Sequence, residues 1–201
     1  MEPNRTNLVR EPTDVFERMF RAVEQVKERL DRACAALAAA NVPYAIVGGN
    51  AVGAWVATVD EGAVRNTQDV DILLRREDLE NATEALESVG FHKDIDMNVT
   101  MFLDGPNGKP SQAVHVIWAN QGVKEHYESP TPQITQSTDI NDKKVVDLIE
   151  LVRMKLNSYR DKDRVHLRDM ISVGLIDQDW PQNFGPVLSE RLQSLLDDPE
   201  G

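Results

Sequence analysis

The sequence contains little cysteine and no long apolar run. Its 201 residues include one cysteine, Cys34, so a disulfide within the chain is excluded. A lone cysteine in a helical pattern is typical of a small buried side chain in a protein of the reducing cytosol. No apolar run approaches the ~18 residues of a membrane span, and the N-terminal residues lack the apolar segment of a signal peptide. We therefore expect a cytoplasmic protein without a membrane segment.

Basic residues are scarce relative to acidic ones. The chain has 22 Lys and Arg against 34 Asp and Glu, which gives a net charge of -12. Extended binding to nucleic acid is disfavoured, because the phosphate backbone requires a dense basic face. A local basic pocket remains compatible with this composition. The length suits one domain with a proper core and a helical appendage.

The most informative stretch covers residues 44–74. Ala45, Ile46 and Val47 form a short apolar run of the kind found in buried strands. Gly48 and Gly49 then allow the backbone to turn sharply and approach a ligand closely. A helix is predicted from Asn50 to about Thr58, and its free N–H groups and dipole would favour an anion.

Two carboxylates open the next predicted strand of this stretch. Side chains at positions i and i+2 of a strand point the same way, about 7 Å apart, so Asp69 and Asp71 are expected to project together. Adjacent carboxylates repel each other unless a cation lies between them. The pair therefore predicts a divalent metal site facing the anion-binding turn.

This arrangement resembles the nucleotidyltransferase superfamily, the polymerase-beta-like fold. The resemblance covers roughly residues 42–175 and rests on a strand, a diglycine turn, a helix and an Asp-x-Asp strand. The matching positions, including the R-x-T-x-D-x-D form of small bacterial members, are Gly48, Gly49, Arg65, Thr67, Asp69 and Asp71. It implies an α/β (α+β) fold with a mixed sheet, flanking helices and a C-terminal helical segment. It also implies that the glycines, Asn50, Arg65 and Thr67 bind nucleotide.

The remaining patterns complete a provisional map of the chain. Residues 1–12 are expected to be a flexible arm, residues 13–142 the nucleotidyltransferase-like core with its N-terminal helix, and residues 143–201 a helical segment packed on that core. The first helix, over residues 13–41, should pack its apolar face on the sheet. Residues 120–141 read as a long connecting loop. Asp147 and Glu150 predict a capping box for the helix that follows a strand over residues 143–146.

His115 departs from the superfamily pattern. A third aspartate commonly occupies the middle of the strand predicted over residues 113–119, and this chain has histidine there. A neutral imidazole binds Mg²⁺ poorly and does not cancel its charge. His115 could serve as a catalytic general base, contact the substrate, or be an ordinary sheet histidine.

A second charged pattern follows in the helical segment. Lys155 lies at the edge of an apolar stripe, and Arg160, Asp163, His166 and Asp169 follow it. The pattern resembles that of nucleotidyltransferase-like toxins of abortive-infection systems. The resemblance implies that Lys155 contacts a triphosphate and that Arg160 and Asp163 support it. A salt-bridge network between helices is the alternative interpretation.

Three functional hypotheses follow. The first is an enzyme that moves a nucleoside monophosphate from a nucleoside triphosphate bound to Mg²⁺, or to Mn²⁺, to a hydroxyl on RNA, protein or a small molecule, with Asp69, Asp71 and His115 as catalytic residues. The second is a catalytically inactive nucleotide-binding or regulatory protein of the same fold, for example a toxin-antitoxin component with a protein partner. The third, a dinucleotide site, is weakened because Asn50 stands where that motif requires glycine.

Overall fold

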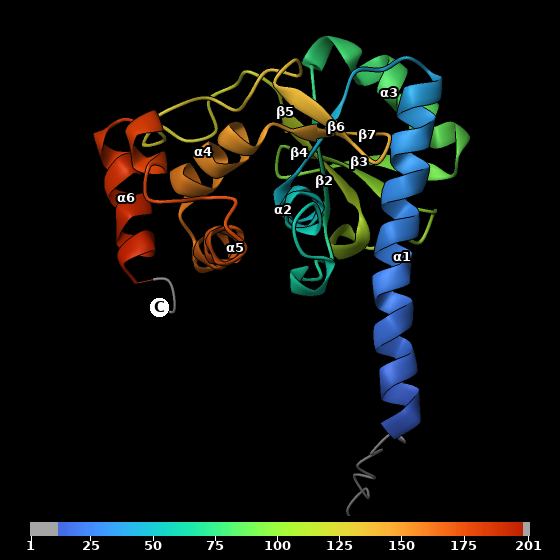
Figure 1. Cartoon of the computed structure of the whole chain (residues 1–201). Coiled ribbons are helices and arrows are strands. Elements are labelled where there is room, and N and C mark those ends of the chain that lie inside the picture. The colour runs from blue at the N-terminus through green and yellow to red at the C-terminus, as the bar shows by residue number, and fades with distance from the viewer. Residues whose placement is uncertain (1–11, 199–201) are drawn as a thin grey trace, which may run out of the picture.

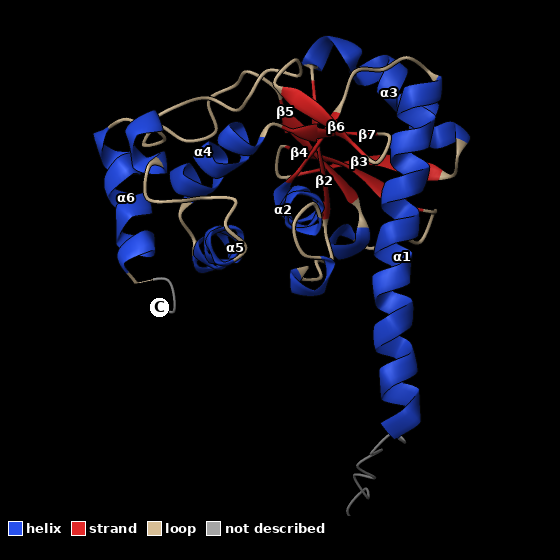
Figure 2. Cartoon of the chain, viewed as in Figure 1, coloured by secondary structure: helices blue, strands red, loops and turns tan. Residues whose placement is uncertain are grey.

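The computed structural model describes residues 12–198 of the chain (Figures 1 and 2). The helices are α1 (Pro12–Ala39), α2 (Gly48–Ala57), α3 (Leu79–Ser88), α4 (Leu148–Ser158), α5 (Asp161–Ser172) and α6 (Pro186–Asp197). The strands are β1 (Ala45–Val47), β2 (Val70–Leu74), β3 (Phe91–Asp96), β4 (Val99–Asp104), β5 (Val114–Trp118), β6 (Ser137–Ile140) and β7 (Lys143–Val146). Short 3-10 turns lie at Glu61–Ala63, Arg76–Asp78, Pro110–Gln112 and Trp180–Asn183. No helix of this part of the chain is long and apolar enough to cross a membrane.

The strands form one mixed sheet in the order β3-β4-β5-β2-β1-β7-β6. β1 is antiparallel to β2 and parallel to β7, while β2 is parallel to β5. The central strands β1 and β2 are largely apolar and almost fully buried, as expected in the middle of a sheet. Figure 2 shows α1 along one side of the sheet and α4, α5 and α6 grouped at the other. The mixed sheet with flanking helices confirms the predicted fold class.

Two strands were not predicted from the sequence. β3 exposes most of its residues, and β6 lies within the segment predicted as a loop over residues 120–141. Both are edge strands with polar side chains, so neither shows an apolar alternation. β6 pairs with β7 through a turn at Asn141 and Asp142, which both have positive φ angles, as tight hairpin turns require. The prediction of a loop over residues 137–140 was therefore wrong.

Two predicted helix starts also differ from the structure. α2 begins at Gly48, two residues before the predicted Asn50, so the diglycine is the first turn of the helix. The capping box at the start of α4 is not formed. The Asp147 carboxylate accepts a hydrogen bond from the Thr138 hydroxyl at 2.6 Å, and Glu150 pairs with Arg153 at 3.1 Å. The hairpin that sequence analysis missed thus takes the side chain that would have capped the helix.

The first helix packs on the sheet over only part of its length. Ala33, Cys34 and Leu37 are buried, as expected for its apolar face. The N-terminal half of α1 instead extends past the rest of the molecule (Figure 1), and Phe16 and Phe20 are 60% and 73% exposed. The prediction that this face packs on the sheet throughout was wrong for that half. The predicted arm over residues 1–12 lies outside the described residues except for Pro12, where α1 begins.

The last three helices form a group beside α2. α4 ends at Ser158, and Tyr159 adopts a left-handed conformation that turns the chain into α5. The Tyr159 hydroxyl donates to the Arg191 carbonyl of α6, and Arg191 Nη1 donates to the Leu156 carbonyl at 2.6 Å. These bonds join the end of α4 to α6. β7, which precedes this group, lies in the sheet next to β1.

Candidate active site

The register of three strands places the key acid beside the diglycine turn. Asp71 of β2 lies opposite Val47 of β1, the residue before Gly48, and level with His115 of β5. Side chains level on neighbouring strands share a face of the sheet. The sheet therefore brings Asp71, the turn and His115 together, although they are far apart in sequence.

The turn packs so closely on Asp71 that only glycine fits. Gly48 has a φ of +68°, and a Cβ added there would lie 2.1 Å from an Asp71 carboxylate oxygen. A Cβ at Gly49 would lie 2.7 Å from the Thr67 hydroxyl. The first turn of α2 contains no acidic residue, so its free N–H groups and dipole still favour an anion at this point.

A cavity of about 520 Å³ opens in front of the acids and the turn. This volume lies within the range of roughly 300–1,000 Å³ typical of small-molecule sites. Its wall includes Gly48, Gly49, Asp69 and Asp71 from the core, and residues of α4 and α5 from the helical segment. Residues of the loop before β6, among them Lys124 and Tyr127, complete the lining. The acids and the turn thus converge on one hollow.

Asp163 organises the side of the cavity formed by α4 and α5. Its carboxylate is 1% exposed and accepts hydrogen bonds from Lys155 Nζ at 3.1 Å, Arg160 Nε at 2.8 Å and Ser158 Oγ at 2.6 Å. Burial acts to raise the pKa of Asp163, but the hydrogen bond from Arg160 and the Lys155 charge outweigh it and lower the pKa to about 2. The carboxylate is therefore charged at neutral pH and holds two cations at the cavity wall.

Lys155 is the most buried of these cations. Its side chain is 9% exposed, and burial lowers its pKa although the charge of Asp163 acts in the opposite direction. The second cation, Arg160, has a side chain that is 72% exposed. One buried carboxylate thus faces two cations, so Asp163 does not fully balance the positive charge on this wall of the cavity.

The carboxylate pair is in a mixed electrostatic environment. Burial raises the pKa of Asp71, the nearby His115 lowers it, and the charge of Asp69 raises it further. His115 Nδ1 lies 3.9 Å from an Asp71 oxygen, and Lys162 Nζ lies 3.4 Å from an Asp69 oxygen. Burial is the largest of these effects, so the pKa of Asp71 is raised despite the basic groups around it.

Three of the residues predicted to bind nucleotide lie elsewhere. The amide of Asn50 donates to the Asp69 carbonyl at 2.7 Å, and Arg65 forms two hydrogen bonds to Asp169 of α5 at 2.9 and 3.0 Å. Thr67 packs over Gly49. All three line a second hollow between α1, α2 and the β6–β7 hairpin. Their positions suit support of the turn and the acids more than contact with a ligand in the main cavity.

Several cavity residues were not assigned from the sequence. Lys162, Ser158, Lys124 and Tyr127 all line the cavity. Lys162 precedes Asp163 in the charged helical motif, so the sequence does indicate it as a candidate cation of the site. Lys124 and Tyr127 lie in a loop without periodicity, and nothing local marks them.

The donor set fits a metal ion held jointly with a ligand. Asp69 and Asp71 offer hard oxygen ligands, and no group of three or more acidic, histidine or cysteine side chains within residues 12–198 is placed to hold a metal. Mg²⁺ is commonly bound by one or two carboxylates together with substrate phosphates and waters. The residues therefore fit a metal that arrives with a phosphate ligand better than one held entirely by the protein.

The chain has the fold of nucleotidyltransferase-like proteins. Among solved structures, an antigenic nucleotidyltransferase-like protein from Paracoccidioides brasiliensis is 21% identical, with a TM-score of 0.56 over 87% of this chain and 88% of that one. The antibiotic-resistance factor ANT(2'')-Ia is 16% identical, with a TM-score of 0.52 over 87% of this chain and 91% of that one. Neither protein-family profiles nor curated protein sequences gave a match. At these identities the likeness concerns the fold.

Proposed function

We propose that the protein is a metal-dependent nucleotidyltransferase. The observation that supports this most strongly is that one cavity joins the Asp69 and Asp71 carboxylates, the diglycine turn and four cationic side chains. Those cations are Lys124, Lys155, Arg160 and Lys162. A nucleoside triphosphate bound to a divalent metal requires both sets of groups, since the acids bind the metal and the cations neutralise the phosphates.

The residues divide into two roles in this proposal. Asp69 and Asp71 would hold Mg²⁺ or Mn²⁺, which supplies charge stabilisation at the reacting phosphate when bound. Gly48 and Gly49 would bring the backbone N–H groups of α2 to the phosphates. Lys155, held by Asp163, would neutralise the pyrophosphate that leaves, and Arg160 would assist from the cavity rim. Asn50, Arg65 and Thr67 would support the turn and Asp69.

The reaction would be a transfer to a hydroxyl. The acceptor oxygen forms a bond to the α-phosphorus, the bond to the β-phosphate oxygen breaks, and pyrophosphate leaves. The carboxylate pair takes the hydroxyl proton. His115 is 20% exposed and adjoins Asp71 without lining the cavity, which favours a role in orienting Asp71 over direct contact with substrate.

The acceptor is defined here only by its chemical class. Tyr127, Val123 and Met154 give the cavity an apolar portion next to its charged one. Such a surface suits a nucleobase or the non-polar part of a small molecule. RNA ends, protein side chains and small molecules all offer hydroxyls, and the net charge of -12 disfavours only extended contact with nucleic acid.

A second candidate function is nucleotide binding without catalysis. His115 favours it, because it occupies the place where the superfamily commonly has a third aspartate. With two carboxylates the cavity could bind a nucleotide as a regulatory ligand, for instance in a toxin-antitoxin pair. The two candidates differ in whether pyrophosphate is released.

Transfer can be measured with nucleoside triphosphates labelled at the α-phosphate, in Mg²⁺ or Mn²⁺, against RNA, protein and small-molecule acceptors. We expect label transfer and pyrophosphate release by the wild type, abolished by Asp71→Asn. Asp142→Asn, in an exposed turn, is the matched control and should remain active. Nucleotide binding without pyrophosphate release for every acceptor would favour the regulatory candidate. Absence of any metal-dependent nucleotide binding would overturn both.

A further inference from the structure

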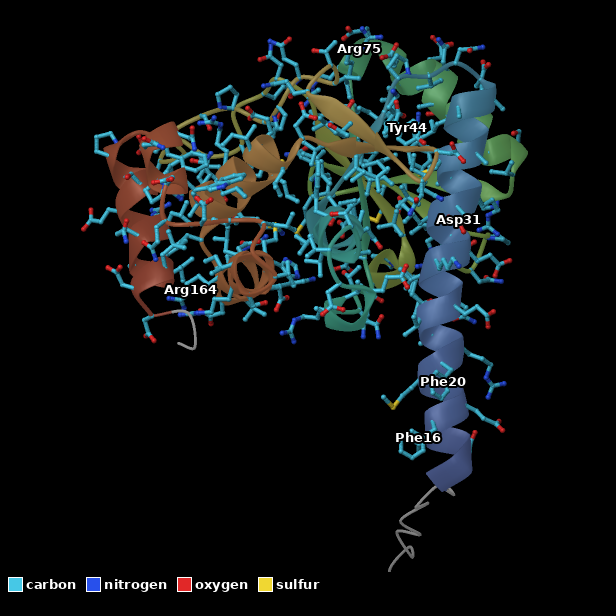
Figure 3. The ribbon with its side chains drawn as sticks, in the orientation of Figure 1. Phe16, Phe20, Asp31, Tyr44, Arg75 and Arg164 are labelled. Carbon is cyan, nitrogen blue, oxygen red and sulfur yellow. The ribbon has the colours of Figure 1, made fainter. Side chains whose placement is uncertain are left out.

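The protruding half of α1 carries an uncovered apolar face. Val15, Phe16, Met19, Phe20 and Val23 are 40%, 60%, 59%, 73% and 41% exposed. Figure 3 shows Phe16 and Phe20 on the part of the helix that extends beyond the sheet. These five side chains define what we call the α1 face.

The α1 face continues the stripe that packs on the protein's own core. Apolar residues alternate at spacings of three and four along the whole helix, at Phe16, Met19, Val23, Val26, Leu30, Ala33 and Leu37. This is the heptad spacing by which helices pack against one another. Ala33 and Leu37 are fully buried, whereas the N-terminal part of the same stripe meets solvent. The same apolar stripe is therefore buried in the core at the C-terminal end of α1 and exposed at its N-terminal end.

The charged residues around the α1 face are balanced in sign. Asp14 pairs with Arg18 at 3.5 Å and Glu17 with Arg21 at 3.9 Å along the helix. Residues 14–29 contain four acidic and four basic side chains, so this segment has no net charge within a chain of net charge -12. Two copies of such an acidic chain repel each other over most of their surface, and least at this segment.

The C-terminal half of α1 is anchored firmly to the core. Arg29, whose side chain is 5% exposed, pairs with Asp104 at 3.2 Å, and Asp31 pairs with Lys143 at 3.0 Å. The protruding half is thus presented by a helix that is already formed and fixed. A preformed surface loses less conformational freedom on binding than a mobile one.

The exposed area matches what a dimer of modest size requires. From the exposed fractions, the α1 face presents on the order of 500 Å² of apolar surface, near the upper limit for the largest patch on a typical monomer. Burial of the same face on two copies removes roughly 1,000 Å² from water, about the minimum for a specific interface. We propose that the protein forms a homodimer in which the α1 faces of two copies pack against each other about a two-fold axis.

The oligomeric state of the full chain tests this directly. Sedimentation equilibrium of the wild type should give twice the mass of one chain at micromolar concentration. The double variant Phe16→Glu, Phe20→Glu should be monomeric, with self-association weakened by about 100-fold or more. Phe16→Ala, Phe20→Ala should weaken it in the same direction without added charge. Because these residues lie outside the core, the melting temperature of the monomeric variants should report a folded protein.

The matched control is Met97→Glu, at the turn between β3 and β4. Met97 is 90% exposed, so it offers an exposed apolar side chain remote from α1 in sequence. This variant should remain dimeric. A wild type that is still monomeric at about 100 μM would overturn the proposal. So would a dimer that persists in both double variants, or one dissociated by Met97→Glu alone.

A spin label at Arg21→Cys locates the interface in the dimer. Arg21 lies on the charged side of α1, and the natural Cys34 is 2% exposed, so labelling is confined to the new cysteine. Pulsed electron resonance should show a defined distance between copies that disappears on addition of Phe16→Glu and Phe20→Glu. If labelled Arg21→Cys is a dimer but its two labels are too far apart to interact, pairing through the α1 face is contradicted.

Discussion

Asp163 holds together the cationic side of the cavity. Lys155, Arg160 and Ser158 all donate to a carboxylate that is 1% exposed. Because the pKa of Asp163 is lowered to about 2, its contribution to stability is present above pH 3.8 and is lost as the pH falls towards 2. The residue therefore serves the fold and, through Lys155, the proposed site.

Two substitutions distinguish the contribution of Asp163 to stability from the contribution of Lys155 to nucleotide binding. Asp163→Asn leaves the buried Lys155 without its counter-charge, and we expect it to lower the free energy of unfolding by roughly 3 kcal/mol. Lys155→Met keeps the volume and leaves Asp163 with Arg160 and Ser158, so it should cost less stability but weaken nucleotide binding about tenfold or more. Lys144→Met, in an exposed pair with Asp139, is the control. Urea unfolding and nucleotide titration measure the two effects, and unchanged affinity in Lys155→Met would exclude contact with the phosphates.

His166 gives the protein a defined response to acid. It is 4% exposed, its Nδ1 lacks a partner among the described residues, and burial and then the Lys155 charge lower its pKa from 6.5 to about 4. Between these values the unfolded chain binds a proton on the ring and the folded chain does not. Protonation thus favours unfolding, and stability falls as the pH is lowered from 6.5 to about 4.

Replacement of the ring isolates this effect. In His166→Gln we expect the fall in unfolding free energy between pH 7 and 4 to be smaller than in the wild type, by on the order of 2 kcal/mol. His92→Gln, which changes an exposed histidine, is the control substitution. Urea denaturation at several pH values gives both slopes. Equal slopes in wild type and His166→Gln would mean that the buried ring does not titrate as described.

At the scale of elements, the junction of β1 and α2 fixes the position of Asp71. Gly48 combines a positive φ with contact to the Asp71 carboxylate, so the turn and the acid are adjusted to each other. A side chain at this point would have to displace the acid. The geometry of the turn and the metal-binding capacity of Asp71 are therefore coupled.

Gly48→Ala tests that coupling, with Gly174→Ala as its control. Both glycines have positive φ angles, +68° and +78°, so the backbone conformation alone should cost each substitution about 1–2 kcal/mol of stability. A Cβ at Gly174 meets nothing within 4 Å, whereas at Gly48 it lies 2.1 Å from an Asp71 oxygen. Only Gly48→Ala should lose metal-dependent nucleotide binding. Equal nucleotide binding by Gly48→Ala and Gly174→Ala would show that the geometry of the turn does not affect the site.

Elements were predictable where their apolar pattern was strong. The burial of β1 and β2 follows from their apolar sequences, whereas the fold class was implied by the resemblance that the diglycine turn and the Asp-x-Asp strand carry. The edge strands β3 and β6 were not predicted, because they are strands by virtue of pairing with β4 and β7 and have no pattern of buried apolar residues. Because β6 was not predicted, the capping box predicted for α4 was wrong as well: Asp147 accepts a hydrogen bond from Thr138 of β6. Likewise, helical periodicity cannot tell which part of α1 the sheet is long enough to cover.

At the scale of the whole molecule, the cavity is assembled from two parts of the chain. The acids and the turn come from residues 47–71, and three of the four cations come from residues 155–162, where α4 ends and α5 begins. The first set was accessible from the sequence because it forms a compact local motif. Lys162, whose ammonium lies 3.4 Å from Asp69 across 93 positions of sequence, was not, since only the packing of α5 beside α2 brings it there. Arg65 and Asp169 join the same two parts at the surface.

The most direct test of the proposed site is the effect of Mg²⁺ on nucleotide affinity, measured by calorimetry with the wild type, Asp71→Asn and Asp142→Asn. If Asp69 and Asp71 hold a metal shared with the triphosphate, Mg²⁺ should strengthen binding to the wild type and to Asp142→Asn by about tenfold or more, and should have little effect on Asp71→Asn. The same gain from Mg²⁺ in all three proteins would contradict the proposed site, because the metal would then bind without the paired acids.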